Sequence, residues 1–149
     1  MPGVSADRVR PARSDDAGRI AALSGTLGYP VRPAELAVRL GRLEASDSDI
    51  VLVAERDGIV VGWIHGAQQD LLESERRCEI LGLVVDDRAR RGGVGRRLVA
   101  EIERWAGQRG IGLVSVRSAT NRLESHPFYE RLGYERVKSQ HVYRKQLAS

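Results

Sequence analysis

The chain contains very little cysteine, and this scarcity excludes two kinds of protein. Cys78 is the only cysteine among 149 residues, so no disulfide can form within the chain and nothing indicates an oxidising compartment. The three histidines, His65, His126 and His141, do not combine with it in a spacing typical of metal ligands. The sequence therefore predicts no metal site, and we interpret Cys78 as a small core residue.

Long apolar runs are also missing. No run is long enough to cross a bilayer, and residues 1–8 lack the apolar centre of a signal peptide. We therefore expect a cytoplasmic protein without a membrane partner.

Lysine is scarce too, because only Lys138 and Lys145 accompany the arginines among the 24 basic residues. The formal net charge of +4 and the pI near 9.7 suggest an acidic partner. A GC-rich genome would explain the arginines equally well, and no recognition helix or aromatic RNA motif is present. We therefore expect no nucleic-acid partner, although a nucleic-acid-binding module stays a third interpretation.

The composition that remains is typical of a folded protein with one domain, residues 1–149. Apolar residues make up 42% and charged residues 30% of the chain. Apolar periodicity predicts a β-α-α-β-β-β-α-β-α-β-β order. This corresponds to an α/β (α+β) fold whose central mixed sheet, mostly antiparallel, has six to seven strands and about four helices. The predicted strands are 9–12, 50–54, 59–65, 78–85, 113–116, 134–137 and 141–146, and the predicted helices follow Ser14, Pro33, Gly93 and Pro127.

The most informative stretch is Arg90-Arg91-Gly92-Gly93-Val94-Gly95, which we call the glycine loop. It follows the apolar run 80–85 and precedes the helical pattern 97–102. The N–H groups that begin a helix have no partner within the helix, and the helix dipole adds positive potential there. Glycine lets the backbone approach a bulky anion, and arginine adds charge. The pattern therefore predicts a site for a phosphorylated ligand.

Three segments resemble the GCN5-related N-acetyltransferase (GNAT) superfamily. The first is the Arg-x-x-Gly-x-Gly pattern of the glycine loop, which matches the acetyl-CoA pyrophosphate loop of that family. The second is the segment from Phe128 to Tyr134, which resembles a helix–glycine–strand segment near the C-terminus. The third is the hairpin Asp57-Gly58-x-x-Val61-Gly62. The resemblance covers nearly the whole chain and implies a GNAT fold and acetyl-CoA as cosubstrate.

The resemblance also implies which residues bind acetyl-CoA. The pantetheine arm would lie beside the strand 78–86, where a bulge separates that strand from the next. Main-chain groups near Leu83, Val84 and Val85 would bond the pantetheine amides. The remaining cofactor candidates are Arg90, Arg91, Gly92, Gly93, Val94, Gly95, Arg96, Ser125 and Phe128. The chain departs from the family at Arg122, which occupies the place of an asparagine that helps to hold the cofactor in many relatives, while Asn121 lies one residue away.

Acetyl transfer to an amine requires a proton acceptor for the amine and benefits from a donor for the departing thiolate. The resemblance implies that Tyr129 is the acid, and the alternative is an aromatic residue that caps the core. Glu79 is the candidate base, and the alternative is a strand glutamate that faces solvent or pairs with arginine. A main-chain amide near Leu83 is the candidate oxyanion donor.

The acceptor pocket of such a fold would be built by the first two helices, the loop after residue 70 and the last strands. Acids and aromatic rings suit a cationic amine. We therefore expect a small-molecule amine, such as an aminoglycoside-like compound, a polyamine or a natural-product amine. A protein lysine or N-terminus stays an alternative, as does an acetyl-CoA-binding regulator without turnover, and a homodimer is left open. The substrate-binding candidates are Tyr29, Trp63, His65, Glu73, Glu75 and His141.

Overall fold

The computed structural model describes residues 7–26, 28–117 and 125–148. Two compact units, Met1–Arg117 and Ser118–Ser149, divide the chain, and each is described by itself. The departure at Asn121 and Arg122 lies outside the described residues. None of the described helices is both long and apolar enough to cross a membrane.

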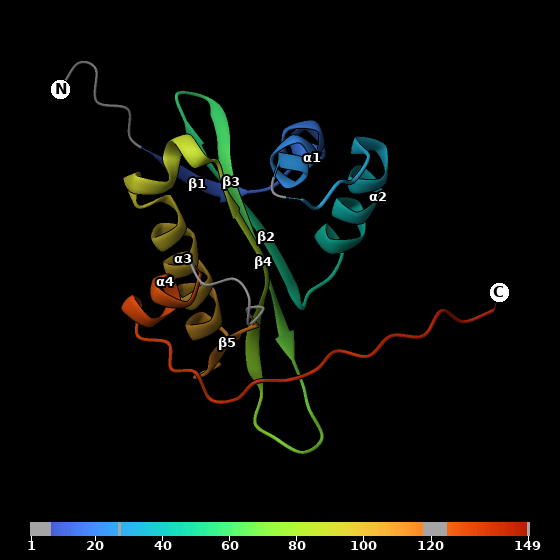
Figure 1. Ribbon diagram of the computed structural model, residues 1–149, viewed down its shortest axis with the longest axis vertical. Coiled ribbons are helices and arrows are strands. Elements are labelled where there is room, and N and C mark those ends of the chain that lie inside the picture. Colours follow the sequence, from blue (N-terminus) through green and yellow to red (C-terminus); the bar gives the residue numbers. More distant parts are fainter. Residues whose placement is uncertain (1–6, 27, 118–124, 149) are drawn as a thin grey trace. The chain divides into compact units, whose positions relative to one another are not determined.

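A single sheet organises the unit Met1–Arg117 (Figure 1). Its strand order follows the chain, and all neighbours are antiparallel except the last two, which are parallel. The mixed, mostly antiparallel α/β architecture is therefore confirmed. The strands are β1 (Arg8–Pro11), β2 (Asp49–Arg56), β3 (Ile59–Gln69), β4 (Arg77–Val85) and β5 (Val114–Val116).

The hairpin between β2 and β3 forms where the sequence predicts it. Asp57 and Gly58 both have positive φ angles, 54° and 78°, which is the geometry of a two-residue turn whose twist matches its strands. The register that the turn sets shifts once, between Ala54 and Glu55, and from there Ala54 pairs with Gly62. Because side chains alternate along a strand, this register decides which residues share a face.

Helices cover both faces of this sheet (Figure 1). On one face Gly62 and Gly66 of β3 lie under α3 (Val94–Gln108); a Cβ at Gly66 would lie 3.0 Å from Cδ1 of Ile102. On the other face Trp63 and its neighbours pack against α1 (Ala17–Thr26) and α2 (Pro33–Glu44). Burial of these apolar stripes against the sheet forms the core.

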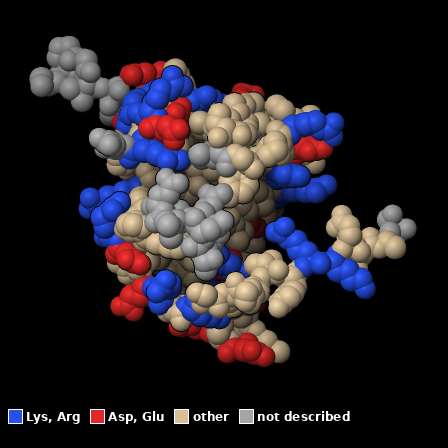
Figure 2. Space-filling view, viewed as in Figure 1, with Lys and Arg blue, Asp and Glu red and all other residues tan. Residues whose placement is uncertain are grey.

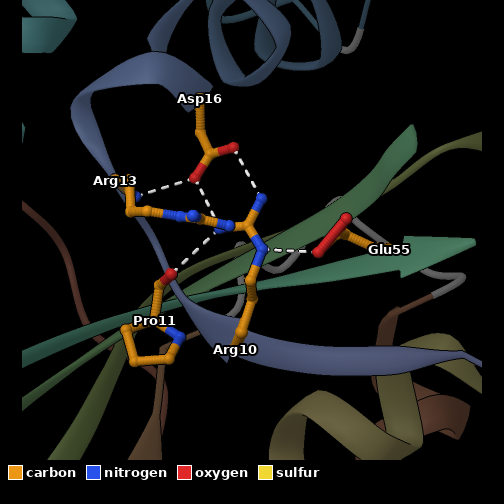
Figure 3. A network of polar contacts seen from close by, with 5 residues as sticks. All are labelled: Arg10, Pro11, Arg13, Asp16 and Glu55. Atoms are coloured by element: carbon orange, nitrogen blue, oxygen red, sulfur yellow. Dashed lines mark hydrogen bonds and ion pairs between the residues drawn. The ribbon is translucent and has the colours of Figure 1, made fainter. Parts of the chain in front are cut away.

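A half-buried arginine, Arg10, connects the short edge strand β1 to neighbouring elements (Figure 3). The guanidinium of Arg10 donates to both carboxylate oxygens of Asp16, at 2.8 and 2.9 Å, and to Glu55 at 2.5 Å. Asp16 also accepts the backbone N–H of Arg13 at 2.7 Å and ends the 3-10 helix η1 (Ser14–Asp16). The Arg10 hydrogen bonds hold the pKa of Asp16 below its ordinary value, so this acid stays charged in a buried place.

Arginine serves ion pairs in many other places. Figure 2 shows basic and acidic side chains lying next to one another on the face in view. Examples are Arg56 with Asp7 at 2.8 Å and Arg76 with Asp70 at 2.7 Å. Part of the arginine content therefore serves contacts within the protein itself.

The predicted final pair of strands, 134–137 and 141–146, is wrong. Neither segment is a strand, and the described residues form five strands rather than six to seven. Val137, Val142 and Tyr143 are 83%, 72% and 90% exposed. Their apolar character predicts strands, but a strand also needs a neighbour for its N–H and C=O groups. The described part of the unit Ser118–Ser149 holds the helix α4 (Ser125–Arg131) and no strand that could supply this pairing.

Candidate functional site

The glycine loop connects the end of β4 to the start of α3, as the sequence predicts. The 3-10 helix η2 (Asp87–Gly92) follows Asp86, whose side chain accepts the N–H of Arg88 at 3.1 Å. Gly93 then has a φ of 78°, in the left-handed region that other residues rarely adopt, and α3 begins at Val94. The first N–H groups of α3, which begins directly after this residue, have no partner within the helix.

The side chains of the glycine loop differ in their surroundings. Val94 and Gly95, the first two residues of α3, are buried, whereas Gly92, Gly93 and Arg96 are exposed. Arg90 lies 3.1 Å from Asp87 in an exposed ion pair. A backbone that is exposed at two glycines, beside exposed arginines and a helix start, can bind an anion.

Two clamps that the sequence did not reveal hold this loop in place. Arg19 of α1 donates to Asp86 at 3.0 Å and to the carbonyl of Val60 at 2.8 Å. Arg56, at the end of β2, lies against Gly92, where an added Cβ would collide with its Nη2 and lie 3.3 Å from its Cζ. Both arginines are far from the loop in sequence, so no local pattern could have indicated them.

Among the described residues, the pairing of β4 with its neighbour β5 ends in the middle of β4. Its parallel pairing with β5 covers Cys78, Glu79 and Ile80 and ends there, although β4 continues to Val85. The register with β3 shifts at the same place, since His65 pairs with Gly82 and Gly66 pairs with Ile80. Leu81 is the extra residue of this bulge and is 48% exposed. The expected bulge is therefore present, beside the three candidates Leu83 (half-buried), Val84 (buried) and Val85 (half-buried).

Three candidate residues share one face of the sheet. Trp63 and His65 lie two residues apart on β3, and Glu79 pairs with Ala67, the next residue on that face. Paired residues in a sheet point to the same side. The structure therefore brings Trp63, His65 and Glu79 together on the face that α1 and α2 partly cover.

Glu79 is a buried acid with a basic neighbour. It is 8% exposed, and its carboxylate lies 3.6 Å from Nε of Arg117. Arginine pairing, one of the alternatives for this residue, is therefore observed. Beside it in the register, Ser115 has a buried hydroxyl with no hydrogen-bond partner among the described residues. Nε1 of Trp63 is also buried without a hydrogen-bond partner among the described residues. Two polar atoms on this face could therefore hydrogen-bond to a ligand.

His65 is held by an acid that the sequence analysis missed. Its Nε2 lies 2.8 Å from Oδ1 of Asp49 at the start of β2, and Asp49 also accepts the hydroxyl of Ser46 at 2.8 Å. Burial favours a higher pKa for Asp49, but the hydrogen bonds from His65 and Ser46 outweigh it and lower the pKa. In the sequence Asp49 stands directly before an apolar run, where an aspartate is typical of a turn. The sequence therefore gave no indication that it contacts His65.

The ring of Trp63 covers a glycine of the neighbouring strand. A Cβ added at Gly82 would lie 2.8 Å from both Cη2 and Cζ3 of the indole. Gly82 is the residue opposite His65 at the bulge. The bulge therefore requires a glycine there because the indole occupies the space that any side chain would need.

The other acceptor candidates of the first unit are exposed. Tyr29 follows the end of α1 and is 49% exposed. Glu73 and Glu75 lie in the exposed loop between β3 and β4. These three candidates therefore lie on the surface, unlike the buried Glu79.

The aromatic candidates of the second unit pack on one another. The Tyr129 ring meets Phe128 and Tyr134 edge-on, at centroid distances of 5.0 and 5.9 Å. The N–H of Tyr134 bonds to the carbonyl of Tyr129 at 3.0 Å across Gly133, whose φ is 93°. Gly133 thus ends α4, which begins at Ser125, and the helix followed by a glycine agrees with the resemblance of this segment. His126 lies in the first turn of α4, and His141 lies in the exposed segment after it.

Cys78 is fully buried in β4, as the sequence predicts for a core residue. Burial raises the pKa of its thiol to about 11. A thiol that stays protonated at neutral pH is a poor nucleophile. Cys78 therefore belongs to the packing of the sheet.

Comparison with known proteins agrees with this architecture. Residues 20–134 match the acetyltransferase (GNAT) family. The uncharacterized N-acetyltransferase YhfO of Bacillus subtilis (strain 168) is 30% identical over 133 residues, which cover 85% of this chain and 89% of the relative.

Solved structures extend the agreement to the fold. An aminoglycoside N-acetyltransferase, AAC(6')-Iy in complex with CoA, superposes with a TM-score of 0.87 at 19% identity over 99% of both chains. The aminoglycoside 6'-N-acetyltransferase AAC(6')-Ih from Acinetobacter baumannii gives a TM-score of 0.83 at 18% identity, over 96% of this chain and 100% of that one. The chain therefore belongs to the acetyltransferase (GNAT) family, as an acyl-CoA-dependent N-acetyltransferase.

Proposed function

We propose that the protein transfers the acetyl group of acetyl-CoA directly to a primary amine of a small molecule. One observation carries this proposal: the open edge of β4, from the bulge at Leu81 to Val85, leads straight into the glycine loop. An extended thioester arm and a pyrophosphate need these two features in this order. The complex of the neighbour AAC(6')-Iy with CoA supports the same donor.

The proposed donor site uses mostly main-chain atoms. The backbone from Arg91 to Arg96 would hold the pyrophosphate, since the first turn of α3 supplies free N–H groups there. Main-chain groups of Leu83, Val84 and Val85 would bond the pantetheine amides at the edge of β4 that has no partner strand there among the described residues. Arg90, Gly92, Gly93, Val94 and Gly95 complete the loop, and Ser125 and Phe128 of α4 are further proposed contacts.

The proposed chemistry balances one proton at each end of the reaction. Glu79 accepts a proton from the acceptor ammonium, through a water, and the free amine attacks the thioester carbonyl carbon. The carbon–sulfur bond then breaks, and the departing thiolate takes a proton from the hydroxyl of Tyr129. The second proton of the attacking nitrogen, which must leave to give the neutral amide, returns the Tyr129 oxygen to its protonated form. An amide near Leu83 stabilises the oxyanion. Arg117, which is largely exposed, lies 3.6 Å from the carboxylate of Glu79.

The proposed acceptor is an amine with further polar groups. Trp63 and His65 share the face of Glu79, and Asp49 adds a second carboxylate beside His65. Acids and aromatic rings attract a cation. Tyr29, Glu73, Glu75 and His141 are proposed to complete the pocket. Two structural neighbours, which are aminoglycoside N-acetyltransferases, support an acceptor of this class.

A thiol-release assay tests the proposal with a panel of aminoglycosides, polyamines, amino acids and peptides. We expect thiol release with at least one small amine, and a large loss of kcat in Tyr129→Phe with acetyl-CoA binding retained. Turnover with peptides alone would instead support a protein acetyltransferase. Acetyl-CoA binding without turnover on any amine would support a regulator.

We further propose a cytoplasmic enzyme that forms a homodimer. The lone buried cysteine requires no oxidising compartment. Val137, Val142, Tyr143 and Leu147 are exposed apolar residues within one short segment, which a second copy could cover. Light scattering on the purified protein measures the mass directly, and a monomer at all concentrations would contradict the dimer.

A further inference from the structure

Three contacts converge on Asp7, the residue directly before β1. Its carboxylate accepts Nε of Arg56 at 2.8 Å and Nη2 of Arg56 at 2.9 Å. Its carbonyl oxygen accepts the Nη1 group of Arg97, which lies in the first turn of α3. Asp7 therefore joins the end of β2 to the start of the helix that the glycine loop precedes.

The same guanidinium also supports the glycine loop. At Gly92 an added Cβ would collide with Nη2 of Arg56, and it would lie 3.3 Å from Cζ and 3.5 Å from Nη1. The φ of Gly93 lies in the left-handed region, whereas no positive φ is found at Gly92. A side chain at Gly92 would therefore require the guanidinium of Arg56 to move, whereas Gly93 is a glycine because of its backbone angle.

The pair between Asp7 and Arg56 is charged and partly shielded. The hydrogen bonds from Arg56 hold the pKa of Asp7 below its ordinary value, so the acid is ionised at neutral pH. The side chains of Arg56 and Asp7 are 30% and 16% exposed. Two parallel bonds between a guanidinium and a carboxylate fix the direction of both groups.

We propose that Asp7, Arg56 and Arg97 form a latch that positions the glycine loop for the phosphates of acetyl-CoA. Asp7 and Arg56 are positioning residues in this proposal, which rests on the donor site proposed above. A loop that is already ordered loses less conformational freedom when its ligand binds. The latch therefore acts on cofactor affinity and leaves the chemical step unchanged.

Asp7→Ala and Arg56→Ala test the latch in two measurements. We expect each variant to weaken acetyl-CoA binding about three- to five-fold by calorimetry, with kcat unchanged at saturation, because partly exposed ion pairs contribute modestly. The double variant should bind no more weakly than either single variant, since both remove one interaction. Arg56→Lys should not restore binding, because lysine lacks the two-pronged donor. Glu101→Gln, which breaks the exposed ion pair with Arg104 on α3, is the matched control and should bind like the wild type.

Hydrogen exchange on the protein without cofactor provides the second measurement. Amides of residues 88–97 should exchange at least about twofold faster in Asp7→Ala, whereas those of 98–106 should not change. If Asp7→Ala folds poorly, Asp7→Asn, which keeps the size of the side chain, replaces it and should also show faster exchange of these amides. The two proposals fail in different ways. If the wild-type protein does not bind acetyl-CoA, the proposed donor site is wrong. Hydrogen exchange on the cofactor-free protein still shows whether Asp7 orders the glycine loop.

Gly92→Ala gives the sharpest comparison. Its Cβ would displace Arg56, so it should weaken acetyl-CoA binding and speed exchange in the wild-type background. Once Arg56→Ala has removed the collision, Gly92→Ala should have little further effect. Unchanged exchange and affinity in Asp7→Ala, or equal effects of Gly92→Ala in both backgrounds, would overturn the latch.

Discussion

Replacing Gly82 with alanine tests the packing at the bulge of β4. The new Cβ would lie 2.8 Å from Cη2 and from Cζ3 of Trp63. Carbon atoms in contact normally stay about 3.5–4.0 Å apart. The indole or the strand must therefore move by about 0.7 Å or more, and both are held in the core by α1 and α2.

The expected cost follows from this crowding. One extra carbon in a well-packed place costs about 1–3 kcal/mol of unfolding free energy. For a chain of this size each kcal/mol corresponds to about 2–4 °C in Tm, so we expect a decrease of about 2–12 °C. Because Trp63 is a proposed acceptor residue, the KM for the amine should rise while the affinity for acetyl-CoA stays unchanged.

Gly41→Ala is the matched control for this substitution. Gly41 lies within α2, and an added Cβ there would meet nothing within 4 Å. Alanine in a helix is about 1 kcal/mol more favourable than glycine, so this variant should be more stable than the wild type. Urea unfolding monitored by circular dichroism measures both variants, and the same chemical change should give opposite signs. A Gly82→Ala protein as stable as the wild type would show that the indole does not lie over Gly82.

Three further predictions concern the loop, the core and the edge strand. Gly93→Val should abolish the thermal stabilisation by acetyl-CoA, whereas Gly93→Asn should retain more of it. The reason is that asparagine tolerates a φ of 78° better than a β-branched residue does. A thermal shift assay with and without acetyl-CoA compares the two variants. Cys78, whose thiol pKa is raised to about 11, should react with a thiol reagent only after unfolding, and rapid labelling of the native protein would contradict this. Arg10 lowers the pKa of Asp16, so this pair stabilises the fold fully above the ordinary aspartate pKa of about 4, and that stability is lost as the pH falls through the lowered value. Urea unfolding at about pH 5 and about pH 3 should show a smaller difference in Asp16→Asn than in the wild type.

The sequence predicted those elements that depend on residues next to one another in the chain. The hairpin at Asp57 and Gly58 and the C-cap at Gly133 follow from residues that adopt positive φ, and both are present. The glycine loop follows the same rule, because the positive φ of Gly93 directly precedes the start of α3. The strands predicted at 134–137 and 141–146 fail because strand formation depends on a neighbour, which apolar periodicity cannot indicate.

Contacts between distant residues could not be predicted. Asp7 meets Arg56 across 49 residues, and Arg19 meets Asp86 across 67. In a chain with 24 basic residues, nothing in the local sequence distinguishes these arginines from solvated ones. The reason for a glycine within a strand could not be predicted either, because the space beside Gly82 is occupied by the indole of Trp63 on another strand.

The side chain of Asp86 joins the two halves of the proposed site within the unit Met1–Arg117. It caps the 3-10 helix that leads into the glycine loop, and it binds Arg19 of α1 at 3.0 Å. Because Arg19 also bonds to the carbonyl of Val60 in β3, α1 cannot move away from the sheet without losing both contacts. The helix that covers the acceptor face and the loop proposed for the donor therefore share one anchor. Arg19 and Asp86 are thus expected to matter for both substrates, although neither residue belongs to a motif that the sequence reveals.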